Sequence, residues 1–416
     1  MDKLQNNKEV MLTDAQLGIY LECIAETNSS SYCLPVIFTF SKEGINAQKL
    51  AEAFDYTANS FDAFSTPLGE VYVHKDLTRD MEKMGYPVID AAFTNEHSIE
   101  VQLPFIKQFM PNPNIVPVLV GSANPQIITD IIAKYWDNEN IGFVISSDLS
   151  HFYNRQEASR IDAVTADMIE NNITENFLPQ QACGYVGICG LLNFAAEKKF
   201  SLIRVGITDS AEKTNDQSSV VGYGAWYLAE QEKCSFLVQN FANTIKNLCA
   251  ISIKTQLENV TLKVENYPRA LETKNATFVT LEIGGNLRGC IGSVVPFEPL
   301  IVDLCKNARN AAFKDPRFIP VEMKEFDKLE MTISLLSKPV PYKFTSEEDL
   351  LNQIQEGVDG VIIKDIGRQA LYLPEVWSQI PDKKEFFNSL KLKAGLKPDW
   401  FSDTFEAYRF TTCVVK

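Results

Sequence analysis

The pattern of apolar and polar positions changes character near residue 234. Between residues 66 and 230, short apolar runs rich in β-branched residues stand between segments of helical periodicity. Such runs are typical of strands covered on both faces, so this part predicts a layered α/β domain with a largely parallel sheet. The expected strands are residues 66–73, 115–121 and 141–147, and the expected helices are residues 75–84, 97–109 and 126–135.

From residue 235 onward the pattern predicts a mixed α and β domain with antiparallel pairing. Two helices over residues 235–259 precede a strand at residues 276–283, a Gly-Gly-Asn turn and a second apolar run. Glycine and asparagine between two apolar runs favour a β-hairpin. The remaining expected elements are strands at residues 329–337, 360–367 and 369–376, and helices at residues 299–312 and 346–355.

The first 60 residues predict a helix, a strand at residues 33–40 and a second helix at residues 45–54. A charged stretch at residues 230–234 is the best boundary between the two larger parts. We therefore expect three segments, at residues 1–60, 61–230 and 235–416.

Composition excludes several classes of protein. Hydrophobic residues make up 45% and charged residues 22% of the 416 positions, and no apolar run approaches the roughly 18 to 20 residues of a membrane span. We expect a cytoplasmic protein, because the N-terminus lacks the apolar region of a secretory signal. The 54 acidic against 39 basic residues give a net charge of −15, which argues against binding nucleic acid.

Cysteine and histidine usage limits the possible chemistry. The nine cysteines form no CxxC pair, which argues against a disulfide framework and against a structural zinc ribbon. The three histidines are His74, His97 and His151, so no imidazole follows residue 151. A Cys-His pair confined to the C-terminal part is therefore excluded.

Cys290 is the candidate nucleophile of that part. It stands between two glycines in the string LRGCIG, residues 287–292, where we expect a turn after an apolar strand. A thiol is nucleophilic only as a thiolate and needs positive neighbours, which Arg288, Lys314 or Arg317 could supply. The alternatives are that Cys290 is a small residue fitted to tight strand packing, and that Arg317 is a solvated arginine in an Asp-Pro turn.

A second candidate site lies in the preceding part. Asp148 and His151 directly follow the expected strand at residues 141–147, at the end where open α/β sheets place their ligands. Together with His97 they could supply two imidazoles and one carboxylate, the ligand set of a 2-His-1-carboxylate iron site. The alternative is that both histidines are hydrogen-bonded structural residues.

Four strings in the C-terminal part occur in the order of one known family. They are LRGCIG, AAFKDPRFIP at residues 311–320, LYLPEV at residues 371–376 and KAGL at residues 393–396. This part, from about residue 234 to 416, resembles the AMMECR family, part A of the AmmeMemoRadiSam system. The resemblance implies a radical SAM protein as partner. The chain has no CxxxCxxC motif, so radical chemistry would belong to that partner.

Three upstream strings resemble the Memo family, part B of the same system. They are NEHSIEVQLPF at residues 95–105, SSDLSHF at residues 146–152 and SSVVGYGAW at residues 218–226. That family resembles class III extradiol dioxygenases in fold and carries a metal-capable pocket. The resemblance implies iron, copper or zinc held by His97 and His151, with Asp148 or Asp216 as the carboxylate ligand. Cys183 falls on the cysteine-glycine segment of the family. The histidine strings HAGY and GPSHH of the family do not occur in this chain, so we expect this domain to be N-terminally incomplete.

The leader, residues 1–60, resembles the opening of a nonribosomal peptide synthetase condensation domain in the strings LTDAQLGIYLEC and INAQKLAEAF. The catalytic HHxxxDG string of that family does not occur in this chain, so its chemistry is not implied.

The sequence therefore predicts a truncated Memo-like layered α/β domain followed by a mixed α+β AMMECR domain. The first functional hypothesis is a protein that either assists a radical SAM partner or modifies a substrate together with it. In this hypothesis Cys290 is the nucleophile, and Arg288 and Arg317 bind anions. The second is a binding scaffold without turnover. The third is a Memo-type metal-dependent oxygenase. The substrate and the oligomeric state stay open.

Overall fold

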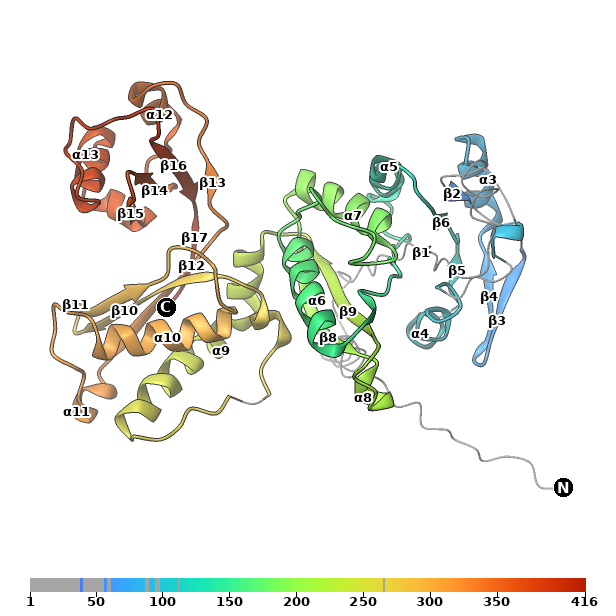
Figure 1. Cartoon of the computed structure of the whole chain (residues 1–416), viewed down its shortest axis with the longest axis horizontal. Helices are drawn as coiled ribbons and strands as arrows, with labels where there is room; N and C mark the ends of the chain where they lie inside the picture. The colour runs from blue at the N-terminus through green and yellow to red at the C-terminus, as the bar shows by residue number, and fades with distance from the viewer. Residues whose placement is uncertain are drawn as a thin grey trace. The chain divides into compact units, whose positions relative to one another are not determined.

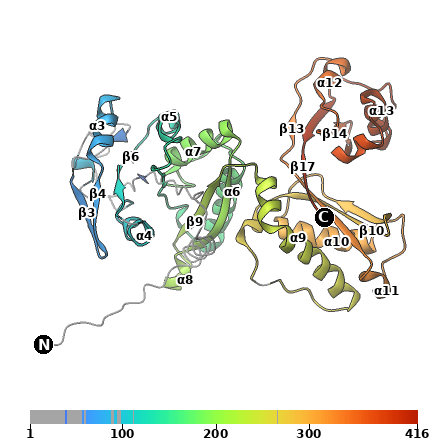
Figure 2. The ribbon, with the colours of Figure 1, turned by 180° about the vertical axis from the view of Figure 1, so that it is seen from behind.

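The structure is a computed structural model of the chain, and it divides into two compact units, Met1–Gln231 and Glu232–Lys416 (Figures 1 and 2). The described residues are 61–86, 90–93, 98–110, 112–264 and 266–416, together with the backbone of β1 (Phe38–Thr39) and β2 (Tyr56–Thr57). The remaining predictions for the leader lie outside the described residues. In the described parts of the chain, no helix is long and apolar enough to cross a membrane.

The first strands of unit 1 form a small three-stranded sheet. In it β4 (Gly69–Val73) lies between β3 (Ala63–Thr66), which is antiparallel to it, and β5 (Asn114–Ile115), which is parallel. The predicted helix after β4 is confirmed as α3 (Lys75–Lys83). His74 caps this helix, because its Nδ1 accepts the Leu77 N–H at 3.3 Å.

Two elements of this region are shorter than predicted. The expected strand at residues 115–121 is split into β5 and β6 (Leu119–Val120), with Pro117 between them, since proline has no N–H to donate to a ladder. The helix expected from residue 97 begins later, as α4 (Leu103–Phe109), with Pro104 in its first turn, where the missing N–H costs no hydrogen bond.

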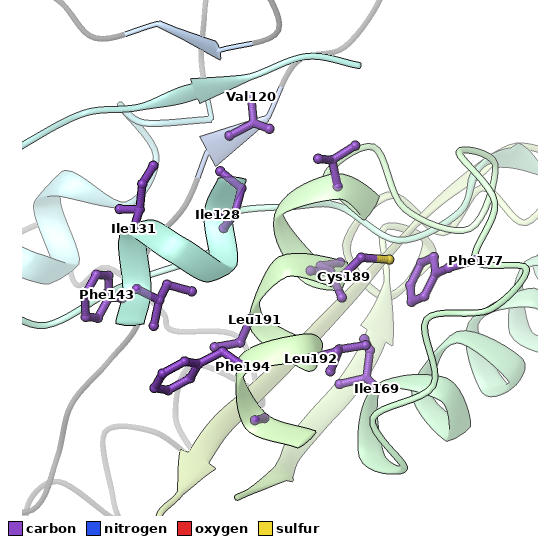
Figure 3. Close-up of a cluster of buried hydrophobic side chains, with 14 of the residues drawn as sticks. Val120, Ile128, Ile131, Phe143, Ile169, Phe177, Cys189, Leu191, Leu192 and Phe194 are labelled. Atoms are coloured by element: carbon purple, nitrogen blue, oxygen red, sulfur yellow. The ribbon is translucent and has the colours of Figure 1, made fainter. Parts of the chain in front are cut away.

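The larger part of unit 1 packs helices against a long antiparallel pair of strands. The elements are α5 (Pro125–Tyr135), β7 (His151–Tyr153), α6 (Arg155–Glu170), α7 (Tyr185–Lys198), β8 (Ser201–Asp209), α8 (Ala211–Thr214) and β9 (Val220–Ala229). Figure 3 shows its core, in which Ile128 of α5 and Leu192 and Phe194 of α7 are fully buried.

The expectation of a largely parallel sheet is wrong for these strands. The sheet order is β7-β9-β8, and both pairs are antiparallel. The connection at residues 210–219 is too short for the crossover that parallel strands require, so β8 and β9 pair as a hairpin.

The predicted strand at residues 141–147 is also wrong. This segment carries only isolated bridge residues, Val144 and Ser146. The backbone that follows is tied to β9, because the Leu149 N–H donates to the Gly222 carbonyl at 2.9 Å and the Gly222 N–H donates to the Ser150 carbonyl at 2.8 Å. The hydrogen bonding to β9 therefore begins at Leu149 and Ser150 and continues through β7, which is part of the antiparallel sheet.

Unit 2 begins with a helical layer on a four-stranded antiparallel sheet of order β11-β10-β12-β17. The strands are β10 (Ala276–Ile283), β11 (Asn286–Gly292), β12 (Glu330–Leu336) and β17 (Thr412–Val415). Figure 1 shows α9 (Lys233–Leu257) and α10 (Leu300–Phe313) along one face of this sheet. The two helices predicted over residues 235–259 are the halves of α9, which kinks at Phe241 (φ −126°).

The predicted hairpin at residues 276–292 is confirmed as β10 and β11. Gly284 and Gly285, at φ +58° and +76°, form its turn. Two consecutive residues at positive φ match the twist of the flanking strands, which is why glycine is used here.

A second four-stranded sheet, of order β13-β16-β14-β15, completes unit 2. Its strands are β13 (Val340–Pro341), β14 (Gly360–Asp365), β15 (Arg368–Tyr372) and β16 (Glu406–Phe410), and its helices are α12 (Glu347–Gln353) and α13 (Lys383–Lys393). A buried cluster joins the two sheets, with Ala276 and Leu336 from the first and Ile362, Leu371 and Phe410 from the second. The chain thus has the predicted fold class, an α/β domain followed by a mixed α and β domain.

Candidate functional site around Cys290

Cys290 lies within the edge strand β11, so the expectation that it stands in a turn is wrong. It is paired with Thr280 of β10, and the pairing continues to Gly292 opposite Phe278. The Thr280 hydroxyl donates to Cys290 Sγ at 3.3 Å. The thiol is therefore half-buried and held by a hydrogen-bond donor on the neighbouring strand.

The two glycines that flank Cys290 are explained by packing. A Cβ on Gly289 would overlap the Ala311 carbonyl of α10, and a Cβ on Gly292 would overlap the Phe278 ring. Because side chains alternate across a strand, Cys290 faces away from α10 while Gly289 faces it. Tight packing thus accounts for the glycines and leaves the role of the thiol open.

Asp315 fixes the backbone of Cys290 from the outer edge of the sheet. Its Oδ2 accepts the Cys290 N–H at 2.9 Å and Arg317 Nη2 at 2.7 Å. Its Oδ1 accepts the Arg317 N–H at 3.1 Å and Arg317 Nε at 2.9 Å. The guanidinium of Arg317, together with the two N–H donors, holds the pKa of this buried carboxyl well below its usual range, so Asp315 is ionised.

Arg317 is brought beside Cys290, as part of the same loop. Its Nη2 lies 3.4 Å from the Cys290 carbonyl oxygen, and 54% of its side chain is exposed. Its Nε and Nη2 contact the two carboxylate oxygens of Asp315, so the two side chains form a bidentate ion pair. This ion pair raises the pKa of Arg317. The positive charge of Arg317 is thus largely matched by its neighbour.

Arg288 is held by α11 (Met323–Phe326). Its Nε and Nη2 donate to Oε1 and Oε2 of Glu325 at 2.9 and 3.2 Å, and this lowers the pKa of Glu325. The third nitrogen, Nη1, is buried without a hydrogen-bond partner among the described residues. Among the described residues, Arg288 makes no contact with the Cys290 thiol.

Lys393 begins the string KAGL and is the last residue of α13. Its Nζ donates to the Leu371 carbonyl oxygen at 3.0 Å. Burial lowers the pKa of Lys393.

Asp315 is the residue of the site that reasoning from the sequence missed, and its signal was the Asp-Pro-Arg turn. We call Cys290, Thr280, Asp315 and Arg317 the Cys290 site.

The candidate residues of unit 1 are only partly brought together. Nε2 of His151 lies 3.2 Å from Oδ2 of Asp148, and both side chains are partly exposed. The Asp148 N–H donates to Cys183 Sγ at 3.3 Å, so Cys183 belongs to the same cluster. Burial, and then the charge of Asp148, raise the pKa of Tyr223 on β9.

A complete metal site is not formed by these residues alone. His97 lies outside the described residues. Within the described ranges, no group of three or more His, Cys, Asp or Glu side chains is arranged to hold a metal ion. The pair His151 and Asp148 supplies two suitable donors, and a stable site needs further ligands.

Comparison with known proteins identifies both parts of the chain. The AMMECR1 family model matches residues 246–415, and the model for Memo-like protein matches residues 50–227. A protein of Methanothermobacter thermautotrophicus is 40% identical over 148 residues, which cover 35% of this chain and 77% of that protein. A protein of Methanocaldococcus jannaschii is 38% identical over 162 residues, covering 38% and 81%.

A solved structure is similar as well. The crystal structure of an uncharacterized protein from Pyrococcus horikoshii is 32% identical, covers 42% of this chain and 90% of that chain, and has a TM-score of 0.40. The family matches and the relatives show that this chain belongs to the AMMECR1 family, with a Memo-like domain preceding the AMMECR1 domain.

Proposed function

We propose that this protein is a component of the AmmeMemoRadiSam system that acts with a radical SAM partner. In this proposal Cys290 is the nucleophile or the anchor for a substrate. The observation that carries the proposal is the setting of Cys290, whose thiol is half-buried and accepts a hydrogen bond from Thr280, and whose carbonyl oxygen lies 3.4 Å from Arg317 Nη2. A partly exposed thiol with a fixed hydrogen-bond donor is open to a substrate and held in position.

Other cysteines of unit 2 provide a contrast. Cys234, Cys249 and Cys305 are buried, and burial raises the pKa of each, that of Cys234 to about 12. These thiols are protonated and pack as small apolar groups. Cys290 differs from these three cysteines because its side chain is partly exposed and accepts a hydrogen bond from Thr280.

Arg288 and Arg317 are proposed as anion binders of the same site. Arg317 keeps an exposed guanidinium edge, and Arg288 keeps the unpartnered Nη1 as a donor for a ligand oxygen or an ordered water. Both arginines are also positioned by carboxylates, so they present fixed donors.

The test is a search for a covalent adduct on Cys290. The chain would be co-expressed with the radical SAM protein of its system and analysed by intact mass and peptide mapping. We expect an adduct on Cys290 that is lost in Cys290→Ser and kept in Cys413→Ser, a partly exposed cysteine on β17. An unmodified Cys290 together with unchanged function of Cys290→Ala in cells would remove the nucleophile role.

A binding scaffold without turnover is the second candidate. It is favoured by the histidine count, because no imidazole follows residue 151 to act as a base for Cys290 within unit 2. In this case the radical SAM partner would be recovered equally by wild type and by Cys290→Ala in a pull-down, and no adduct would form.

A Memo-type metal-dependent oxygenase is the third candidate, favoured by the contact between His151 and Asp148. His97, His151 and Asp148 would hold the iron, copper or zinc. Elemental analysis of anaerobically purified wild type and of the double variant His97→Ala with His151→Ala tests it. Stoichiometric metal that is lost in the double variant is the expected result, and wild type that binds no added metal would exclude it.

A further inference from the structure

The helical layer of unit 2 contains a pocket of about 560 Å³, a volume within the range of small-molecule sites. It is lined by α10, by the end of α9 and by the segment that follows α9. We call it the α10 pocket. It is separate from the Cys290 site, because Gly289 packs against Ala311 of α10 and the next side chain of the strand, Cys290, points away from that helix.

The way in which α9 ends creates this space. Asn259 adopts a left-handed conformation (φ +54°), and the Val260 N–H donates to the Thr255 carbonyl at 2.8 Å. This Schellman-type cap ends the helix and directs the following segment along α10. Leu262 and Val264, two residues apart in that segment, both line the pocket.

One part of the α10 pocket is apolar. Ile301 and Cys305 of α10 are buried, and Leu262 and Val264 are half-buried. Val302 also lines the pocket, yet 44% of it is exposed. The pocket therefore leaves apolar surface in contact with water, and an apolar group that covers this surface would gain free energy.

The polar part of the pocket follows along α10. Arg309 donates from Nε to the Ser252 carbonyl at 3.1 Å and from Nη2 to Thr255 Oγ1 at 3.4 Å, so two neutral acceptors of α9 fix its guanidinium. Lys314, directly after the helix, is exposed and lines the pocket as well. Ile301 and Arg309 are about 12 Å apart along the helix axis, so the apolar and the cationic parts are distinct.

The two cations have no counter-charge in the described part of the chain, since neither Arg309 nor Lys314 forms an ion pair there. A third cation of the pocket, Lys306, differs from them because it pairs with Glu298 at 2.9 Å. The half-buried amide of Asn310 makes no side-chain hydrogen bond within the described ranges. Two cations and an amide thus offer unused donors beside an apolar space.

We propose that the α10 pocket binds a small molecule that has an apolar body and one anionic end. The anionic group, a carboxylate or a phosphate, contacts Arg309 and Lys314, because a guanidinium matches the geometry of both anions. The apolar body covers Ile301 and Val302. This site goes beyond the proposed function, since it lies on the helical layer and requires neither Cys290 nor a partner protein.

Photo-crosslinking of the full-length chain tests the proposal. The probes are a decanoic acid that carries a diazirine and the neutral primary amide of the same acid, both used below the concentration at which they form micelles. Illumination expels nitrogen from the diazirine, and the carbene inserts into a neighbouring bond. Peptide mass spectrometry locates the attached probe, and the yield at increasing probe concentration gives the half-saturating concentration.

We expect the acid to label peptides within residues 256–268 and 300–314, at a lower half-saturating concentration than the amide. An excess of unlabelled decanoate or of decyl phosphate should suppress this labelling, and the stronger competitor identifies the preferred anionic group. Cys290→Ala should be labelled like wild type, so a failed adduct test for Cys290 leaves this result unaffected.

Two variants at exposed positions of the pocket measure the contribution of charge. Lys314→Met should raise the half-saturating concentration of the acid about two- to five-fold and leave that of the amide unchanged, whereas Lys328→Met, outside the pocket, should change neither. Val302→Glu places a negative charge in the pocket and should weaken binding of the acid about three-fold or more. Val358→Glu, at a valine that is 50% exposed elsewhere in unit 2, is its matched control and should have no effect.

Equal labelling by the acid and the amide, with no effect of Lys314→Met, would overturn the proposal, because the occupant would then be a neutral apolar group. Labelling that neither decanoate nor decyl phosphate suppresses, or labelling confined to other peptides, would also overturn it. Circular dichroism of each variant checks that a change in labelling does not come from unfolding.

Discussion

Replacing Asp315 with asparagine should destabilise unit 2 more than any change of similar size on its surface. The two carboxylate oxygens accept four hydrogen bonds, two on each oxygen, from the Cys290 and Arg317 N–H groups and from Arg317 Nε and Nη2. An asparagine has one oxygen and one NH₂ group. Whichever way the amide is turned, its NH₂ faces two donors.

The magnitude follows from which donors lose their acceptor. One of them is a backbone N–H in a partly buried hydrogen bond, and leaving it unpaired costs about 1–3 kcal/mol. The other belongs to Arg317, whose side chain is 54% exposed, so water replaces the bond and the loss is about 1 kcal/mol or less. The expected loss for Asp315→Asn is therefore about 2–3 kcal/mol.

Cys249 provides a reporter for this measurement, because it is fully buried in α9 of unit 2. Its labelling by a brief pulse of thiol reagent, followed across a urea series, reports the unfolding of this unit. With a slope of about 2 kcal/mol per molar urea, the midpoint should fall by about 1 M. Asp399→Asn, at an exposed position, is the control and should stay within about 0.5 kcal/mol of wild type.

The pH dependence gives an independent check. The folded pKa of Asp315 is lowered, so its contribution is fully present above the unfolded value, about 3.9, and is lost as pH falls through the lower folded value. The difference between wild type and Asp315→Asn should thus be constant from about pH 5 to 8 and shrink in more acidic solution. A midpoint for Asp315→Asn equal to that of Asp399→Asn would refute the reasoning.

Three further outcomes are expected. Gly289→Ala should destabilise unit 2 by about 3 kcal/mol, because the added Cβ would overlap the Ala311 carbonyl. Gly285→Ala should cost only about 1 kcal/mol, because its Cβ meets open space and only the positive φ is unfavourable. Pulse labelling of Cys249 measures the stability of unit 2 in both variants. Glu170→Gln should destabilise unit 1 by about 3 kcal/mol, measured by labelling of the buried Cys189, because Glu170 pairs with Arg204 at 2.6 Å and accepts Trp226 Nε1 at 3.0 Å. Thr280→Val should slow iodoacetamide alkylation of Cys290 about two- to ten-fold, the value of one hydrogen bond to the thiolate, and an unchanged rate would show that the bond does not support it.

Local signals made much of unit 2 predictable. The hairpin of β10 and β11 follows from alternating apolar runs around two glycines, and the end of α10 at Phe313 follows from Asp315 and Pro316. Each of these features depends on residues that are neighbours in sequence. The family strings likewise placed Cys290 and Arg317 in one site, and the structure puts them in contact through the Cys290 carbonyl.

Features that depend on distant pairing could not be obtained in this way. The apolar run at residues 141–147 has the composition of a strand, but whether it forms one depends on where β9 runs. The role of Asp315 depends on β11 being an edge strand, whose outward N–H needs an acceptor. The buried cluster of Ala276, Leu336, Ile362, Leu371 and Phe410 forms only because the second sheet packs on the first, and no periodicity encodes that contact.

Arg288 and Arg317 should act mainly through their carboxylate partners, although the sequence presents both as cations that could activate Cys290. Arg288 forms a bidentate pair with Glu325, and Arg317 forms one with Asp315. Replacing either arginine should therefore lower the stability of unit 2 more than the alkylation rate of Cys290. Cys249 labelling and the rate of iodoacetamide alkylation of Cys290 measure these two properties in the same samples. If the alkylation rate fell in either variant while the stability of unit 2 stayed the same, that arginine would support the thiol directly and this reasoning would fail.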